Sequence, residues 1–156
     1  MRTETTTELI AKPDVVMLDL AVTSREAALR TLHEVLAQQP GVTDGERLLR
    51  DILERVIVAH VCIADEVALP HARTTAVDRI VLGVARVKEP GVGFDGEHPN
   101  VRLIFMIGTP RHQVEEYLRL VAAISRLLRK PGARAALLAA PTEGEFRAVL
   151  AGGAAT

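Results

Sequence analysis

The chain has 156 residues, of which 48% are hydrophobic and 25% charged, with a formal net charge of −1. This balance is typical of a single globular domain. Because the chain lacks a strong positive charge and contains only 3% aromatic residues, we expect no nucleic-acid partner. The longest apolar stretch, around residues 101–108, is too short to cross a bilayer. The chain is therefore expected not to be inserted in a membrane. Cys62 is the only cysteine, which excludes an internal disulfide, so the chain is also expected to be cytoplasmic.

The first third of the chain predicts one strand and two helices. Residues 14–22 are aliphatic and rich in β-branched side chains, which favours a strand. The sequence Thr-x-x-Glu at residues 23–26 has the spacing of a capping box, and the helix it begins ends at Pro40. The same spacing at residues 43–46 begins a second helix. Its apolar side chains repeat at helical intervals: Leu48, Leu49, Ile52, Leu53 and Val56.

The middle of the chain predicts strands. Residues 57–66 have no clear period, so a loop or turn is expected there. A short strand over residues 66–72 is ended by Pro70, which cannot donate a hydrogen bond to a central ladder. Residues 79–87 and 100–109 are apolar on both faces, as in a buried sheet, and a glycine- and proline-rich surface turn joins them.

The last third of the chain predicts three helices. The first follows Pro110, carries an apolar stripe and ends at residues 131–132, a Pro-Gly pair. A short alanine-rich helix comes next, and the capping spacing of residues 142–145 begins the last one. Strands that alternate with helices indicate an α/β layer fold of one domain, with helices covering a sheet.

Four of the five histidines have settings that point less strongly to a reactive site than that of the fifth. His33 lies within a predicted helix, His98 in a polar turn and His60 in the region without a clear period. His112 lies near a strand end, where sites of α/β sheets often gather. No two of these residues have the spacing of metal ligands, and we expect no metal site.

His71 stands out because it directly follows a short strand and Pro70 in the sequence VALPHART. A stiff backbone suits a reactive group, and neutral imidazole offers a lone pair as a nucleophile or base. Arg73 lies two residues further on, and Arg55 ends the preceding helix. Since arginine binds two phosphate oxygens at once, this grouping favours a phosphoryl acceptor over a hydrolase. The alternative is that His71 only caps a strand and hydrogen-bonds to a loop.

One long segment of the chain resembles the active-site segment of phosphotransferase-system IIA components of the fructose and mannitol type, which include nitrogen-regulatory IIA proteins. It consists of VALPHART followed by RIVLGVARVKEPGVGFDGEHPNVRLIFMIGTP. The resemblance implies a mixed sheet of about five strands flanked by helices on both faces. It places the domain at residues 14–151, between an N-terminal extension of residues 1–13, expected to be poorly ordered, and a tail of residues 152–156. It also implies that no cofactor is needed.

The resemblance assigns roles to the residues around His71. His71 is expected to take a phosphoryl group from the histidine phosphocarrier protein and pass it to a IIB component or a regulated protein, in sugar uptake or in regulation. This makes the chain a phosphotransferase component. Arg55 matches a family arginine sixteen residues before the active histidine and is expected to hold the phosphate, with Arg73 assisting it.

The chain departs from the family pattern at two places. The family has a glycine-rich run between the arginine and the histidine, whereas residues 61–66 contain no glycine. A second family histidine is replaced by Tyr117, ahead of Leu118, and its hydroxyl is expected to orient the phosphate. His112 is the alternative for that role. The glycine-free run favours a second hypothesis, a regulatory or interaction module that is no longer efficiently phosphorylated.

Overall fold

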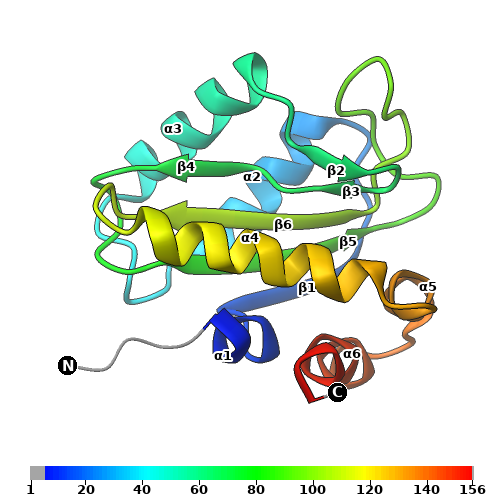
Figure 1. Ribbon diagram of the computed structural model, residues 1–156. Coiled ribbons are helices and arrows are strands. Elements are labelled where there is room, and N and C mark those ends of the chain that lie inside the picture. Colours follow the sequence, from blue (N-terminus) through cyan, green and yellow to red (C-terminus); the bar gives the residue numbers. More distant parts are fainter. Residues whose placement is uncertain (1–5, 156) are drawn as a thin grey trace.

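A mixed sheet forms the centre of the molecule in the computed structural model, which describes residues 6–155 (Figure 1). The strand order is β1-β5-β6-β3-β2, and β4 also pairs with β6. Strand β5 runs antiparallel to β6, whereas β1, β3 and β4 run parallel to the strands they pair with in the centre. The strands are β1 (Val15–Leu20), β2 (Cys62–Ala64), β3 (Val67–Ala68), β4 (His71–Arg73), β5 (Val81–Val87) and β6 (Leu103–Thr109).

Helices cover both faces of this sheet, as the sequence predicts (Figure 1). α2 and α3 pack on one face, and the other four helices pack on the opposite face. None of the helices within residues 6–155 combines the length and apolar character that a bilayer crossing requires. The helices are α1 (Thr6–Ala11), α2 (Arg25–Leu36), α3 (Gly45–Val58), α4 (Val114–Arg129), α5 (Ala133–Ala139) and α6 (Glu143–Ala155).

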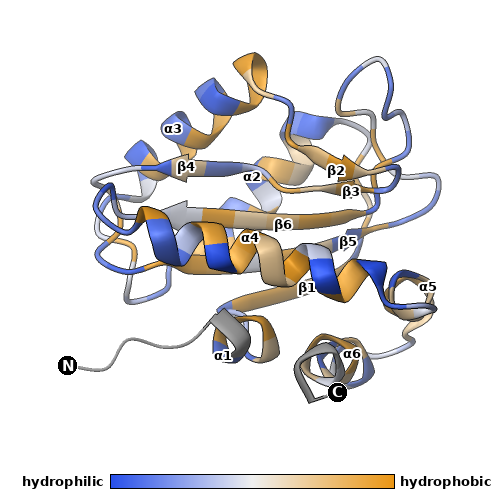
Figure 2. Ribbon diagram, viewed as in Figure 1, coloured by the Kyte–Doolittle hydropathy of each residue, from blue (hydrophilic) through white to orange (hydrophobic). Residues whose placement is uncertain are grey.

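Two apolar cores result from the alternation of side chains along the central strands. On β6, Ile104 and Met106 face the helices α2 and α3, whereas Phe105 and Ile107 face α4 and its neighbours. All seven residues of β5 and all seven of β6 are buried, as expected for strands covered on both faces. Figure 2 shows most of β6 in the hydrophobic colour.

Residues 57–66 differ from the predicted loop. α3 continues to Val58, and residues 62–64 form β2, a short strand that runs antiparallel to β3. The predicted strand of residues 66–72 is divided into β3 and β4, both of which pair with β6, because Pro70 interrupts the ladder between them. If β3 and β4 are counted as one interrupted strand, the sheet has the five strands that were expected.

The ends of several elements also differ from the predictions. The caps of α2 and α3 are Ser24 and Asp44, one residue after the predicted threonines, and each accepts a hydrogen bond of 3.1 Å from a backbone amide. Thr142 caps α6 as predicted, accepting from the Glu145 amide at 3.1 Å. Part of the expected extension, residues 6–11, forms α1, and residues 1–5 lie outside the described residues. α6 runs into the expected tail as far as residue 155.

Candidate functional site

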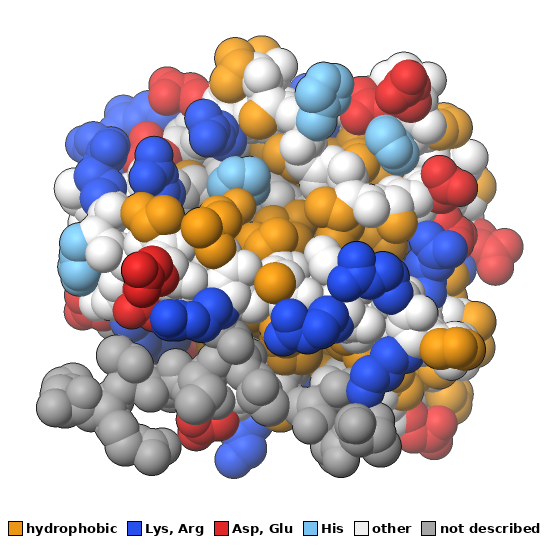
Figure 3. Space-filling model, viewed as in Figure 1, with side chains coloured by type: hydrophobic (Ala, Val, Ile, Leu, Met, Phe, Trp, Pro, Cys, Tyr) orange, Lys and Arg blue, Asp and Glu red, His pale blue; other side chains and the backbone are white. Residues whose placement is uncertain are grey.

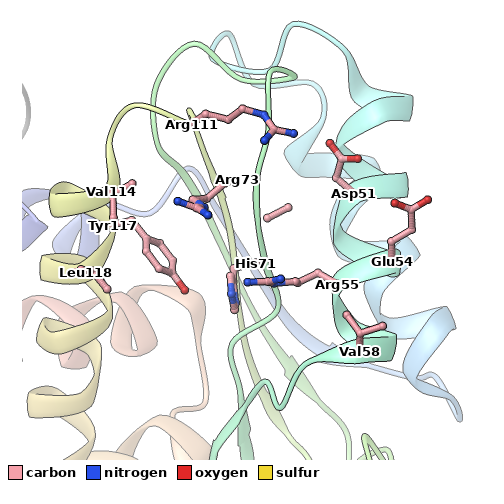
Figure 4. Close-up of a pocket in the computed structure, with 11 residues that line it drawn as sticks. Asp51, Glu54, Arg55, Val58, His71, Arg73, Arg111, Val114, Tyr117 and Leu118 are labelled. Carbon is pink, nitrogen blue, oxygen red and sulfur yellow. The ribbon is translucent and has the colours of Figure 1, made fainter.

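A pocket of about 580 Å³ lies between the end of α3, strand β4 and the beginning of α4 (Figure 4). The split of the β3–β4 strand places the first residue of β4, His71, in this pocket. Sequence reasoning proposed five site residues, and four of them line it. The lining side chains are Asp51, Glu54, Arg55, Val58, His71, Ala72, Arg73, Arg111, Val114, Tyr117 and Leu118.

The ring of His71 is held in one tautomer. Its Nδ1 lies 3.0 Å from the Leu69 carbonyl oxygen. Because a carbonyl oxygen only accepts, Nδ1 must carry the proton and donate it, which leaves Nε2 with a free lone pair when the ring is neutral. Burial lowers the pKa of the half-buried His71, the hydrogen bond to Leu69 opposes that change, and Arg55 and Arg73 lower the pKa further. The ring is therefore neutral at neutral pH.

Three guanidinium groups surround the pocket. Arg55 lies in the last turn of α3 and Arg73 at the end of β4, and both side chains are exposed. In Figure 4, Arg55 reaches toward His71 from α3, and Arg73 lies above the ring. Arg111 also lines the pocket, from the segment before α4. Three such cations make the pocket suited to a multiply charged anion.

Tyr117 lies against His71 from the first turns of α4. The two ring centroids are 5.3 Å apart with the planes tilted by 36°. Burial raises the pKa of Tyr117, and the charges of Arg55 and Arg73 oppose that rise. The hydroxyl thus stays protonated at neutral pH and can donate a hydrogen bond to an anion in the pocket.

His112, the alternative to Tyr117, is exposed and is not among the residues that line the pocket. Its neighbour Arg111 does line the pocket, although the sequence did not single it out. The available signal was its position directly after Pro110, at the end of a predicted strand, the same setting that drew attention to His112. Which of two adjacent loop residues turns toward the pocket depends on the path of the backbone into α4.

Two carboxylates, Asp51 and Glu54, also line the pocket. Asp51 accepts a hydrogen bond of 2.6 Å from the buried Thr74 hydroxyl and lies 3.7 Å from Arg47. This interaction ties α3 to the segment after β4. Glu54 is exposed at the edge of the pocket. Asp51 therefore serves to hold the walls of the pocket together.

Exposed apolar side chains border the pocket. Ile57 and Val58, at the end of α3, are 73% and 77% exposed, and Leu118 on α4 is 57% exposed. Val114 is a further apolar residue of this rim, at 36%. Figure 2 shows the end of α3 in the hydrophobic colour, and Figure 3 shows hydrophobic side chains gathered on this face beside Lys and Arg. Large exposed apolar side chains around a concave site are characteristic of protein-binding surfaces.

The sheet order, the two helical layers and a single histidine among arginines at a strand end together define a IIA-type α/β protein. The chain belongs to the family described as "Phosphoenolpyruvate-dependent sugar phosphotransferase system, EIIA 2", whose sequence profile matches residues 9–152. It is 30% identical over 139 residues to the fructose-specific EIIA component of Haloferax volcanii, covering 88% of this chain and 90% of the relative.

Solved structures agree with this fold. The nitrogen regulatory protein IIA-Ntr of Neisseria meningitidis superimposes with a TM-score of 0.78 at 18% identity, covering 92% of this chain and 97% of that one. The mannitol enzyme IIA of Escherichia coli, in its complex with phosphorylated enzyme IIB, gives a TM-score of 0.75 at 19% identity, covering 89% and 95% of the two chains. The resemblance inferred from the sequence is thus confirmed at the level of family and fold.

Proposed function

We propose that His71 is a phosphoryl acceptor and donor that takes its phosphoryl group from the histidine phosphocarrier protein. The observation that carries this proposal is the hydrogen bond of 3.0 Å between Nδ1 of His71 and the Leu69 carbonyl. It leaves Nε2 unprotonated, so its lone pair is available to an incoming phosphoryl group. Membership of the EIIA family supports a phosphocarrier or regulatory role for the chain as a whole.

The transfer exchanges one nitrogen–phosphorus bond for another. The Nε2 lone pair of His71 forms a bond to phosphorus while the bond from phosphorus to the donor's imidazole breaks, and the donor keeps that electron pair as neutral imidazole. Nε2 carries no proton to be removed, so the step needs no general base. The pocket then has to position the two groups and stabilise the charge on the transferring oxygens.

The arginines and Tyr117 supply that stabilisation. Arg55 lines the pocket from α3 and Arg73 from β4, and the charges of both lower the pKa of His71. We assign to them the binding of the phosphoryl oxygens, with the Tyr117 hydroxyl as a third donor. Arg111 extends the same cationic lining. Hydrogen bonds from cations to phosphate are about twice as strong as neutral ones, so these residues are expected to control the transfer rate.

The apolar rim supports a protein, and not a small molecule, as the partner. Val58 on α3 and Leu118 on α4 offer exposed apolar area on both sides of His71, as a partner that presents its own phosphorylated side chain requires. The relative from E. coli is named for a complex with phosphorylated enzyme IIB. We therefore assign a IIB component, or a regulated protein that uses the same surface, as the next partner of this chain in the cytoplasm.

A second candidate function is a regulatory or interaction module that is not efficiently phosphorylated. The observation that favours it is the structure of the glycine-free segment, because residues 62–64 form strand β2 and pair with β3. Backbone amides committed to a ladder are less free to approach a phosphate than a glycine-rich loop is. In this function the apolar rim binds the partner whether or not His71 is modified.

The intact mass of the protein after incubation with phosphoenolpyruvate, enzyme I and the histidine phosphocarrier protein separates the two functions. The phosphocarrier predicts one acid-labile phosphoryl group on the wild type and on His112→Ala, and none on His71→Ala. His112 is a matched control because it is an exposed histidine near the pocket. A wild-type chain that stays unmodified while the carrier in the same tube is phosphorylated favours the interaction module. Labelling of His71→Ala refutes the proposed role of His71.

A further inference from the structure

A second group of chemically active side chains lies outside the pocket. It consists of Cys62 on β2 and of Asp95 and His98 in the segment between β5 and β6. One ligand atom from each residue, the sulfur, a carboxylate oxygen and a ring nitrogen, lies within 4.8 Å of the other two. Cys62 is far in sequence from Asp95 and His98, so the spacing of the histidines gave no sign of this grouping and no metal site was expected.

The backbone holds the two loop ligands in place. The Asp95 side chain accepts a hydrogen bond of 2.8 Å from the Glu97 amide, and the His98 amide donates to the Asp95 carbonyl at 3.2 Å. The Phe94 amide donates to the His98 carbonyl at 2.9 Å, and the Phe94 ring is buried. The guanidinium of Arg25 donates to the Phe94 carbonyl at 2.7 Å from α2. Such support reduces the reorganisation that ligand binding requires.

Cys62 approaches this turn from the sheet. It is partly buried and packs against the core beneath α2 and α3. Asp95 is exposed, so the group is open to solvent on one side. A metal ion can enter from that side, and water can supply a fourth ligand.

The donor set selects the class of metal. A thiolate with an imidazole and a carboxylate suits Zn²⁺, which takes sulfur, nitrogen and oxygen ligands in a tetrahedron of four. Ca²⁺ and Mg²⁺ prefer oxygen ligands alone and more of them. The carboxylate and thiolate together carry two negative charges, which exceed the single positive charge of the neighbouring Arg25.

We propose that Cys62, Asp95 and His98 bind one zinc ion, with water as the fourth ligand. The ion links β2, an edge strand of the sheet, to the turn at residues 94–98. When it binds, the Cys62 thiol gives its proton to solvent and the sulfur forms a bond to the metal. His98 loses the Nδ1 proton that it donates to Asp95 at 2.8 Å and takes up one at Nε2 from solvent, which frees the Nδ1 lone pair and the carboxylate oxygen for the metal.

The test is a titration of the full chain, stripped with a chelator, with Co²⁺ as a coloured probe and then with Zn²⁺ in competition. The expected result is one equivalent of Co²⁺ bound, with a thiolate-to-cobalt charge-transfer band that Zn²⁺ abolishes. Cys62→Ser is expected to remove the band, and Asp95→Asn and His98→Gln to weaken binding by at least about tenfold. Zn²⁺ is also expected to raise the thermal midpoint of the wild type, since a ligand of the folded state alone stabilises it.

Matched controls separate this site from the phosphoryl pocket. His112→Ala removes another exposed histidine and is expected to leave the cobalt titration unchanged. His71→Ala removes the histidine of the pocket and is also expected to leave it unchanged, so failure of the proposed phosphoryl transfer does not affect this result. The proposal is overturned if the wild type binds no Co²⁺ stoichiometrically at micromolar concentration, or if Cys62→Ser and His98→Gln, folded by circular dichroism, bind it as the wild type does.

Discussion

Arg86 gives the sharpest stability prediction because its guanidinium is buried and fully engaged. On β5, the residue is 4% exposed and donates to the Leu137 and Ala140 carbonyls, both at 2.8 Å. It also pairs with Asp19 at 3.1 Å and lies 5.9 Å from the centre of the Phe146 ring. It therefore joins the sheet to the end of α5 and to α6.

Arg86→Met keeps most of the packing and removes every hydrogen bond. Two carbonyls are then left without a donor, at about 1–3 kcal/mol each, whereas Asp19 is half exposed and can be hydrated. We expect the free energy of unfolding to fall by about 2–6 kcal/mol, the cost of the two buried carbonyls that lose their donor. With an m-value of about 1–3 kcal/mol/M in urea, the midpoint falls by about 1 M or more at unchanged m.

Arg30→Met is the matched control. The Arg30 side chain is 52% exposed and forms an ion pair of 2.8 Å with Glu26 on α2. Exposed pairs contribute about 0–1 kcal/mol, so its urea midpoint should stay close to that of the wild type. If Arg86→Met and Arg30→Met lower the unfolding free energy equally, water replaces the guanidinium at the α5 carbonyls and the reasoning from burial is refuted.

Three further predictions concern the backbone and the site. Gly91→Ala should lower the stability in urea more than Gly132→Ala does. Both glycines have positive φ, but only at Gly91 would an added Cβ meet a backbone oxygen, that of Val101 at 2.5 Å. Equal losses of stability in the two variants would contradict this reasoning. Burial lowers the pKa of His71 below its usual 6.5, so the unfolded chain takes up the proton first as the pH falls, and stability is lost from about pH 6.5 downward. The His71→Asn variant should therefore lose less stability than the wild type between pH 7 and 5. Above pH 7 the two proteins should show the same pH dependence. Tyr117→Phe should slow phosphoryl transfer to His71 by about tenfold or more, which corresponds to the free energy of one hydrogen bond to a charged group. The urea midpoint should not change. An unchanged transfer rate would show that the hydroxyl does not bind the phosphate.

The family, the layer architecture and the central histidine could be derived from the sequence. Helices and buried strands are encoded by local periodicity, which is why α4, β5 and β6 lie close to their predicted bounds. His71 could be selected because Pro70 before it and arginines near it are local features with a chemical meaning. These signals need no knowledge of which distant segments meet.

The tertiary structure decided the features that depend on contacts between distant segments. Strand β2 forms only because β3 offers it a partner, so the isolated sequence of residues 57–66 resembled a loop. The choice of Arg111 over His112 depends on how the chain enters α4. Cys62 meets Asp95 and His98 only when the sheet places β2 beside the turn after β5. Local propensity acts over a few residues, whereas pairing and packing act between residues that the chain keeps far apart, and only the folded structure shows which of them meet.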